Sequence, residues 1–120
     1  MTGARDDMGA ILQIRVSAET ADPRLVEKSW PRLVALAWPV EATPPSGRPG
    51  VLELVSGLHD RLAFGDLDPG LREALGPGIL RAQALKEGLE QALADRDPRT
   101  ADRVSYQVEE TLWELERGLG

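Results

Sequence analysis

The period of the apolar positions changes along the chain. Over Ala10–Ala18, the apolar residues Leu12, Ile14 and Val16 alternate with polar ones, a period of two that includes β-branched side chains. This alternation predicts one short N-terminal strand over Ala10–Ala18. Because a lone strand leaves backbone N–H and C=O groups without partners, a second strand from this chain or another has to pair with it.

From Pro23 to Trp38 the apolar residues recur with the period of a helix. Pro31 lies inside this segment and removes one backbone hydrogen bond, so we expect the helix to kink or to split at Ser29. An alternative is that Arg32–Val40 forms a second strand in a β-α-β arrangement. The pattern leaves both interpretations open.

The next segment, 39–50, holds four prolines and two glycines, which predicts a loop without regular structure. This proline-rich loop divides an N-terminal strand and helix unit from a C-terminal helical unit. Residues 1–9 are polar and predict a flexible tail, and 10–120 predict a single domain.

The helical period returns after the loop. Asp-Pro pairs at 22–23, 68–69 and 97–98 are typical of helix N-termini, because Asp caps the first turn and Pro fits its first position. A short turn between two long amphipathic segments favours an antiparallel helical hairpin at the C-terminal end. The predicted elements are Val51–Phe64 with a stop at Gly65, a short helix or turn Asp68–Leu75 ended by Gly76–Pro77, and the helices Gly78–Ala94 and Asp97–Leu119.

Together these patterns predict a mainly α fold: a compact bundle of three to four helices with a short N-terminal β-strand. The alternative is an α+β fold with a second strand near 32–40. The composition favours helices, since its apolar residues are mostly Leu and Ala and only 4% of the chain is aromatic.

The charge is unevenly distributed. The net charge of −6 comes entirely from residues 51–120, which carry eight basic and fourteen acidic side chains. Such a surface repels a phosphate backbone, so we expect no nucleic-acid partner. No apolar run is long enough to span a membrane, and the polar N-terminus and lack of cysteine predict a cytoplasmic protein. The preference for Arg over Lys is typical of a GC-rich bacterial genome.

No sequence pattern points to catalysis, a cofactor or a metal. His59 is the only histidine and lies outside any metal-ligand spacing, so we expect a structural role for it and no enzyme activity. Leu71–Leu75 and Ile79–Leu93 have the outline of a helix-turn-helix. The second of these segments carries only Arg81 and Lys86 as cations, which is few for binding DNA.

One feature of the last helix is difficult to explain as core. Tyr106 and Trp113 share a face opposite the apolar stripe around Val108 and Leu115. Aromatic residues among charges are typical of a protein interface with a polar rim. The alternative is that this face packs inside the chain. The rim residues are Arg99, Asp102, Glu109 and Arg117.

These observations predict a small non-catalytic protein-interaction module, a subunit or adaptor of a larger bacterial complex. Its partner is another protein, encoded nearby, or a second copy of the chain, and a dimer is one possibility. Leu12, Ile14 and Val16 of the strand are a second candidate docking feature, by pairing with an exposed strand edge. The alternative function is a small regulator, either an acidic antitoxin-like antidote or, less favoured, a helix-turn-helix DNA binder.

Overall fold

The computed structural model describes residues 12–14, 18–20, 22–38 and 50–119, and in this part the chain is mainly helical, as predicted. The predicted tail 1–9 and nearly all of the proline-rich loop lie outside the described residues. No described helix is both long and apolar enough to cross a membrane. The elements are the strands β1 (Leu12–Ile14) and β2 (Ala18–Thr20) and the helices α1 (Arg24–Ser29), α2 (Pro31–Ala37), α3 (Val51–Ala63), α4 (Pro69–Ala94) and α5 (Pro98–Gly118).

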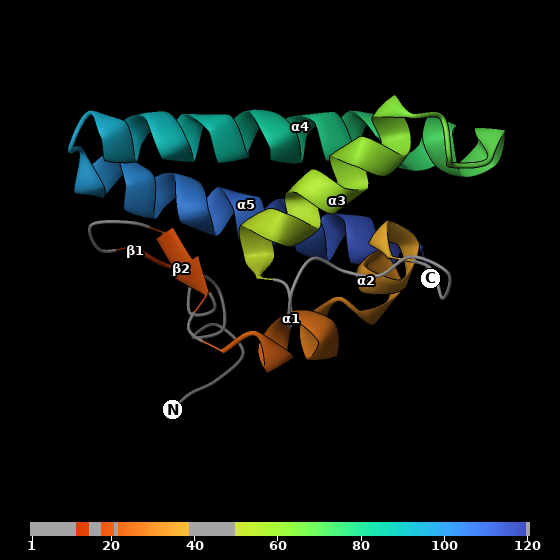
Figure 1. Ribbon diagram of the computed structural model, residues 1–120, viewed down its shortest axis with the longest axis horizontal. Helices are drawn as coiled ribbons and strands as arrows, with labels where there is room; N and C mark the ends of the chain where they lie inside the picture. Colours follow the sequence, from red (N-terminus) through yellow and green to blue (C-terminus); the bar gives the residue numbers. More distant parts are fainter. Residues whose placement is uncertain (1–11, 15–17, 21, 39–49, 120) are drawn as a thin grey trace.

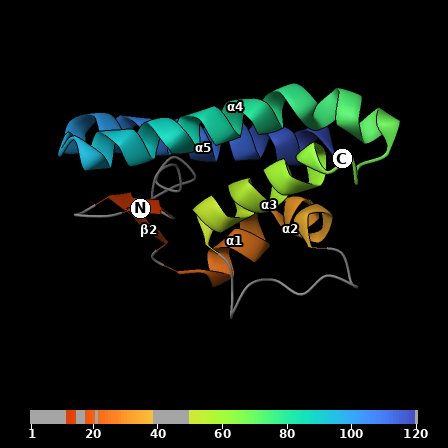
Figure 2. The same cartoon turned by 45° about the horizontal axis from the view of Figure 1, so that its top comes forward.

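The two longest helices, α4 and α5, lie side by side as an antiparallel hairpin, and the other described elements pack on one side of it (Figures 1 and 2). Helix α3 crosses the hairpin obliquely, next to α1 and α2. The predicted turn between α4 and α5 is confirmed: Arg96 has a φ of 57°, and Asp97 caps α5 by accepting a hydrogen bond from Thr100 N at 3.1 Å. Hydrogen bonds from the side chain and backbone of Thr100 lower the pKa of the Asp97 carboxyl.

Helix α4 runs without a break from Pro69 to Ala94, so the predicted interruption at Gly76–Pro77 is wrong. Pro77 lies on the exposed side of α4, where water can bond the carbonyl that loses its N–H partner. The short helix predicted at Asp68–Leu75 is the first part of α4. Because no turn separates it from Ile79–Leu93, the outlined helix-turn-helix is not formed.

The segment after the strands divides at Trp30, which lies between α1 and α2 with φ −129° and ψ 59°. The predicted split at Ser29 is therefore confirmed, since α1 ends at that residue. The alternative of a second strand near 32–40 is wrong over 32–37, where α2 is helical. Pro31 starts α2 because the first position of a helix does not need a backbone N–H.

The prediction of one strand over Ala10–Ala18 is not supported. Ala18 belongs to β2, which pairs antiparallel with β1 in the register Leu12↔Thr20 and Ile14↔Ala18. The described part of the predicted strand is thus divided between two short strands. Thr20 then connects this pair to the helices, since its hydroxyl accepts a hydrogen bond from Val51 N at 2.9 Å at the start of α3.

The core lies between the hairpin and the elements on its inner side. It includes side chains from β1, from α1 and α2, and from the three longer helices. Trp30 is its largest fully buried member. The other large apolar residues that are fully buried are Leu12, Leu33, Leu54, Leu58, Ile79, Leu89 and Leu112, with the valines Val26, Val51 and Val55.

Two glycines of α4 differ in their surroundings, which gives a matched pair of substitutions. A Cβ at Gly88 would meet no atom within 4 Å, whereas one at Gly78 would lie 2.6 Å from Leu115 Cδ2. Gly88→Ala is therefore expected to raise the free energy of unfolding by about 0.5–1 kcal/mol, through lower backbone entropy in the unfolded chain. Gly78→Ala brings the same entropic gain, but an overpacking cost of about 1–3 kcal/mol opposes it.

Chemical denaturation of both variants measures this difference. We expect Gly88→Ala to be the more stable by about 1 kcal/mol or more. Equal stabilisation by the two substitutions would contradict the close approach of α4 to α5 at Gly78.

Candidate functional site

The outer face of α5 holds part of the predicted interface. Tyr106 is 42% exposed and is one of three large apolar side chains that are exposed in the described part of the chain. It lies on the side of α5 that faces away from the core, along with the exposed residues Arg99, Asp102 and Arg117. The structure thus exposes an aromatic ring and flanking charges on the outer part of α5, and their role as an interface stays a prediction.

Trp113 has a different environment from Tyr106. It is half-buried and packs against the core, with its ring 5.5 Å from the ring of Trp30 at an interplanar angle of 63°. This edge-to-face geometry is favourable for aromatic pairs. Trp113 therefore contributes to packing within the chain, and Tyr106 is the exposed aromatic residue of α5.

Glu109 does not lie on the exposed rim where the sequence placed it. Its side chain is completely buried, and its Oε2 accepts a hydrogen bond from Leu12 N at 2.8 Å. The reason is that β1 packs along α5 and covers this side of the helix. Leu12 is buried by the same contact, so neither residue is available to a partner. Nothing is described of the Ile14 side chain, and Val16 lies outside the described residues.

Glu116, one helical repeat after Glu109, is a second buried carboxylate that the sequence pattern did not reveal. Its two oxygens accept hydrogen bonds from the backbone of Arg32 at 3.2 Å and of Leu33 at 3.0 Å. These are the free N–H groups of the first turn of α2, which has no capping side chain of its own. Glu116 therefore caps α2 from another helix, and the negative charge suits the helix N-terminus.

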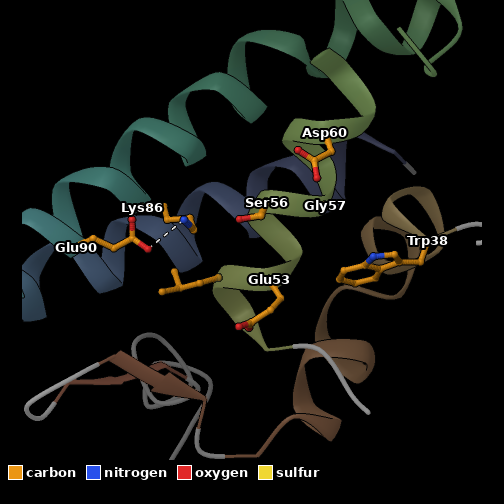
Figure 3. A pocket seen from close by; sticks show the side chains of 8 residues that line it. Trp38, Glu53, Ser56, Gly57, Asp60, Lys86 and Glu90 are labelled. Carbon is orange, nitrogen blue, oxygen red and sulfur yellow. Dashed lines mark hydrogen bonds and ion pairs between the residues drawn. The ribbon is translucent and has the colours of Figure 1, made fainter. Parts of the chain in front are cut away.

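A cavity of about 400 Å³ opens over α3 between the end of α2 and α4 (Figure 3). The Trp38 ring forms one side, and Lys86 and Glu90 of α4 form the other. Along α3, Glu53 and Asp60 lie at the two ends. The lining residues are Trp38, Leu52, Glu53, Ser56, Gly57, Asp60, Lys86 and Glu90.

Two contacts place Trp38 beside α3. A Cβ on Gly57 would lie 3.1 Å from Trp38 Cζ2 and 3.2 Å from Ala37 Cβ, so the absence of a side chain there lets the end of α2 approach closely. Arg61 Nε donates a hydrogen bond to the Leu36 carbonyl at 3.2 Å. The position of the indole ring therefore depends on α3 as well as on α2.

The cavity is acidic. Lys86 Nζ forms an ion pair with Glu90 Oε2 at 3.1 Å, and the Lys86 side chain is only 16% exposed. Glu53 Oε1 accepts a hydrogen bond from Gly50 N at 3.0 Å. The Asp60 residue is exposed, and its carboxylate has no hydrogen-bond or ion-pair partner among the described residues. The formal charge of the lining residues is −2.

His59 lies half-buried on α3 and does not line this cavity. Among the described residues, no group of three or more His, Asp or Glu side chains is arranged to hold a metal ion. The geometry of the described site therefore suits binding of a cationic group, with carboxylates and an indole face as its recognition groups.

The sequence pattern does not reveal this cavity, because its walls come from separate elements: the residue after α2, α3 and α4. The i, i+4 spacing of Lys86 and Glu90 predicts their ion pair. Gly57 in the middle of an amphipathic helix is a further signal, since an internal glycine often marks a close approach. Neither signal identifies Trp38 as the facing residue.

Comparison with protein-family models gives no match, and comparisons with curated proteins and with solved structures give no match either.

Proposed function

We propose that the chain is a non-catalytic protein-interaction module, a cytoplasmic subunit or adaptor that acts by binding another protein or a second copy of itself. The observation that supports this most is the outer face of α5, where Tyr106 is exposed among charged side chains. Tyrosine is enriched at binding hot spots because its ring gives a large contact area at a low entropic cost, and its hydroxyl can bond a partner.

The charged neighbours of Tyr106 suit the rim of such an interface. Arg99 and Arg117 lie on the same exposed face, and Asp102 lies one turn before Tyr106. Charges at a rim contribute little to affinity, but they steer the encounter and select partners of complementary charge. Tyr106 is thus the expected anchor, and its charged neighbours are expected to determine specificity.

Tyr106→Ala tests this proposal with little risk to folding, because the side chain is exposed and outside the core. Loss of an anchor is expected to weaken self-association or partner binding about tenfold or more. Light scattering of the purified chain over a range of concentrations measures self-association, and a pull-down with the products of neighbouring genes measures partner binding.

Leu80→Ala is the matched control, since Leu80 is also large, apolar and exposed but lies on α4. It is expected to leave the association unchanged. A wild-type chain that is strictly monomeric, with the same captured proteins for wild type and Tyr106→Ala, would refute the role of this face.

A second candidate function is an acidic antidote that neutralises a basic protein. The acidic lining of the α3–α4 cavity and the net charge of −6 favour it. Coexpression separates the two functions: an antidote is expected to restore growth to cells that produce the toxic product of an adjacent gene.

A further inference from the structure

We propose that the α3–α4 cavity is a docking site for an arginine side chain of a basic protein partner. This inference rests on the proposed role of the chain in binding another protein and adds the chemical class of that partner. The cavity is separate from the outer face of α5, because neither Tyr106 nor any other residue of α5 lines it.

Charge complementarity identifies the ligand as a cation. Lys86 is neutralised by Glu90 at 3.1 Å, so it does not offset the remaining carboxylates. The Asp60 carboxylate has no hydrogen-bond or ion-pair partner among the described residues. The Glu53 carboxylate accepts one backbone hydrogen bond at 3.0 Å, so it can accept others. The two carboxylates would repel an anion, whereas both attract a cation.

The shape of the lining favours a guanidinium over an ammonium. Trp38 lies on one side of α3, and Glu53 and Asp60 project from α3 at the two ends of the cavity (Figure 3). A planar guanidinium can stack on an indole while it donates paired hydrogen bonds to a carboxylate, which a compact ammonium cannot do equally well. The volume of about 400 Å³ is near the lower end of the range for ligand pockets and suits one or two side chains.

The partner itself is expected to be basic. Residues 51–120 carry the whole net charge of −6, so the helices around the cavity attract a positively charged chain over a longer range. Arginine in such a chain supplies both the long-range attraction and the local recognition.

Isothermal titration of the full chain with a capped hexa-arginine peptide tests the proposal. Binding is expected at low salt and to weaken at roughly 0.15 M salt, because exposed charges are screened. Asp60→Asn and Trp38→Leu are each expected to weaken binding about fivefold or more. A hexa-lysine peptide is expected to bind more weakly than hexa-arginine.

The control is Glu73→Gln, which removes one negative charge from an exposed position of α4 outside the cavity. It is expected to change the affinity less than about twofold. Equal losses for Asp60→Asn and Glu73→Gln would reduce the effect to general electrostatic attraction and overturn the proposal. So would an absence of binding to hexa-arginine, or equally tight binding of free arginine, which would indicate a small-molecule site.

The outcome is independent of the Tyr106 test. If hexa-arginine fails to bind while Tyr106→Ala still abolishes association, the interaction module remains and the arginine site is refuted. If hexa-arginine binds as expected but Tyr106→Ala leaves association unchanged, the cavity is the binding site and the outer face of α5 is not.

Discussion

Trp30→Ala is expected to lower the free energy of unfolding by about 3–5 kcal/mol, the largest effect of any single substitution considered. Trp30, the residue between α1 and α2 in the chain, has a fully buried side chain, and its ring packs edge to face on Trp113 at 5.5 Å. Removing it leaves a cavity and breaks the aromatic pair. Because small domains have only about 5–15 kcal/mol of stability, the variant is expected to be close to unfolding at moderate temperature.

Trp30→Phe separates the contribution of side-chain volume to the free energy of unfolding from the contribution of the indole N–H. The buried Nε1 of Trp30 has no hydrogen-bond partner among the described residues, so phenylalanine keeps a ring against Trp113 while it removes this donor. We expect a loss of about 1–2 kcal/mol for Trp30→Phe, well below that of the alanine variant. Urea denaturation followed by circular dichroism measures both, and equal losses would contradict the description of the aromatic pair.

Glu116→Ala is expected to lower the free energy of unfolding by about 2–4 kcal/mol. Its carboxylate accepts hydrogen bonds from the backbone N–H groups of Arg32 and Leu33, at 3.2 and 3.0 Å, and without it both donors lose their partner. Alanine also removes the negative charge from the N-terminus of α2. The α1–α2 unit is thus expected to detach from α5 before the hairpin unfolds.

Glu114→Ala is the control, since Glu114 lies on the exposed side of the same helix. It is expected to change stability by less than about 0.5 kcal/mol. Hydrogen exchange of Glu116→Ala adds a local measurement, with faster exchange at Arg32 and Leu33 than in wild type. Equal stability of the Glu114 and Glu116 variants would show that α2 is capped in another way.

Local signals determined much of the helical architecture. The Asp-Pro pairs at 68–69 and 97–98 predicted two helix starts, and both Asp68 and Asp97 accept capping hydrogen bonds, at 3.0 and 3.1 Å. Gly65 was predicted as a helix stop, and its φ of 72° explains why glycine occurs there. These signals are reliable because the interactions involved span only a few residues.

Local signals failed where packing overrides them. Gly76–Pro77 is a typical helix stop, yet α4 continues through it, because Pro77 faces solvent and Gly78 allows contact with Leu115 of α5. The contribution of that contact to stability is not visible in the local sequence. Likewise, the helical period of α5 distinguishes an apolar stripe from the rest but does not say which polar residues are buried.

The polar contacts that join the parts of the fold were decided by tertiary structure alone. Glu109 binds the backbone of β1 and Glu116 that of α2, across sequence separations of 97 and 84 residues. In the sequence, both look like ordinary charged residues of an exposed helix face. Burial of a carboxylate becomes favourable only when a distant backbone supplies donors for it, so no local pattern can reveal it.

The same distinction applies to the two candidate sites. The sequence alone identified Tyr106 as an aromatic residue opposite the apolar stripe, because helical periodicity determines the direction of each side chain on one helix. The α3–α4 cavity exists only because Trp38, next to the end of α2, comes together with Asp60 of α3 and Lys86 of α4. Periodicity describes one element at a time, whereas a cavity depends on how several elements pack.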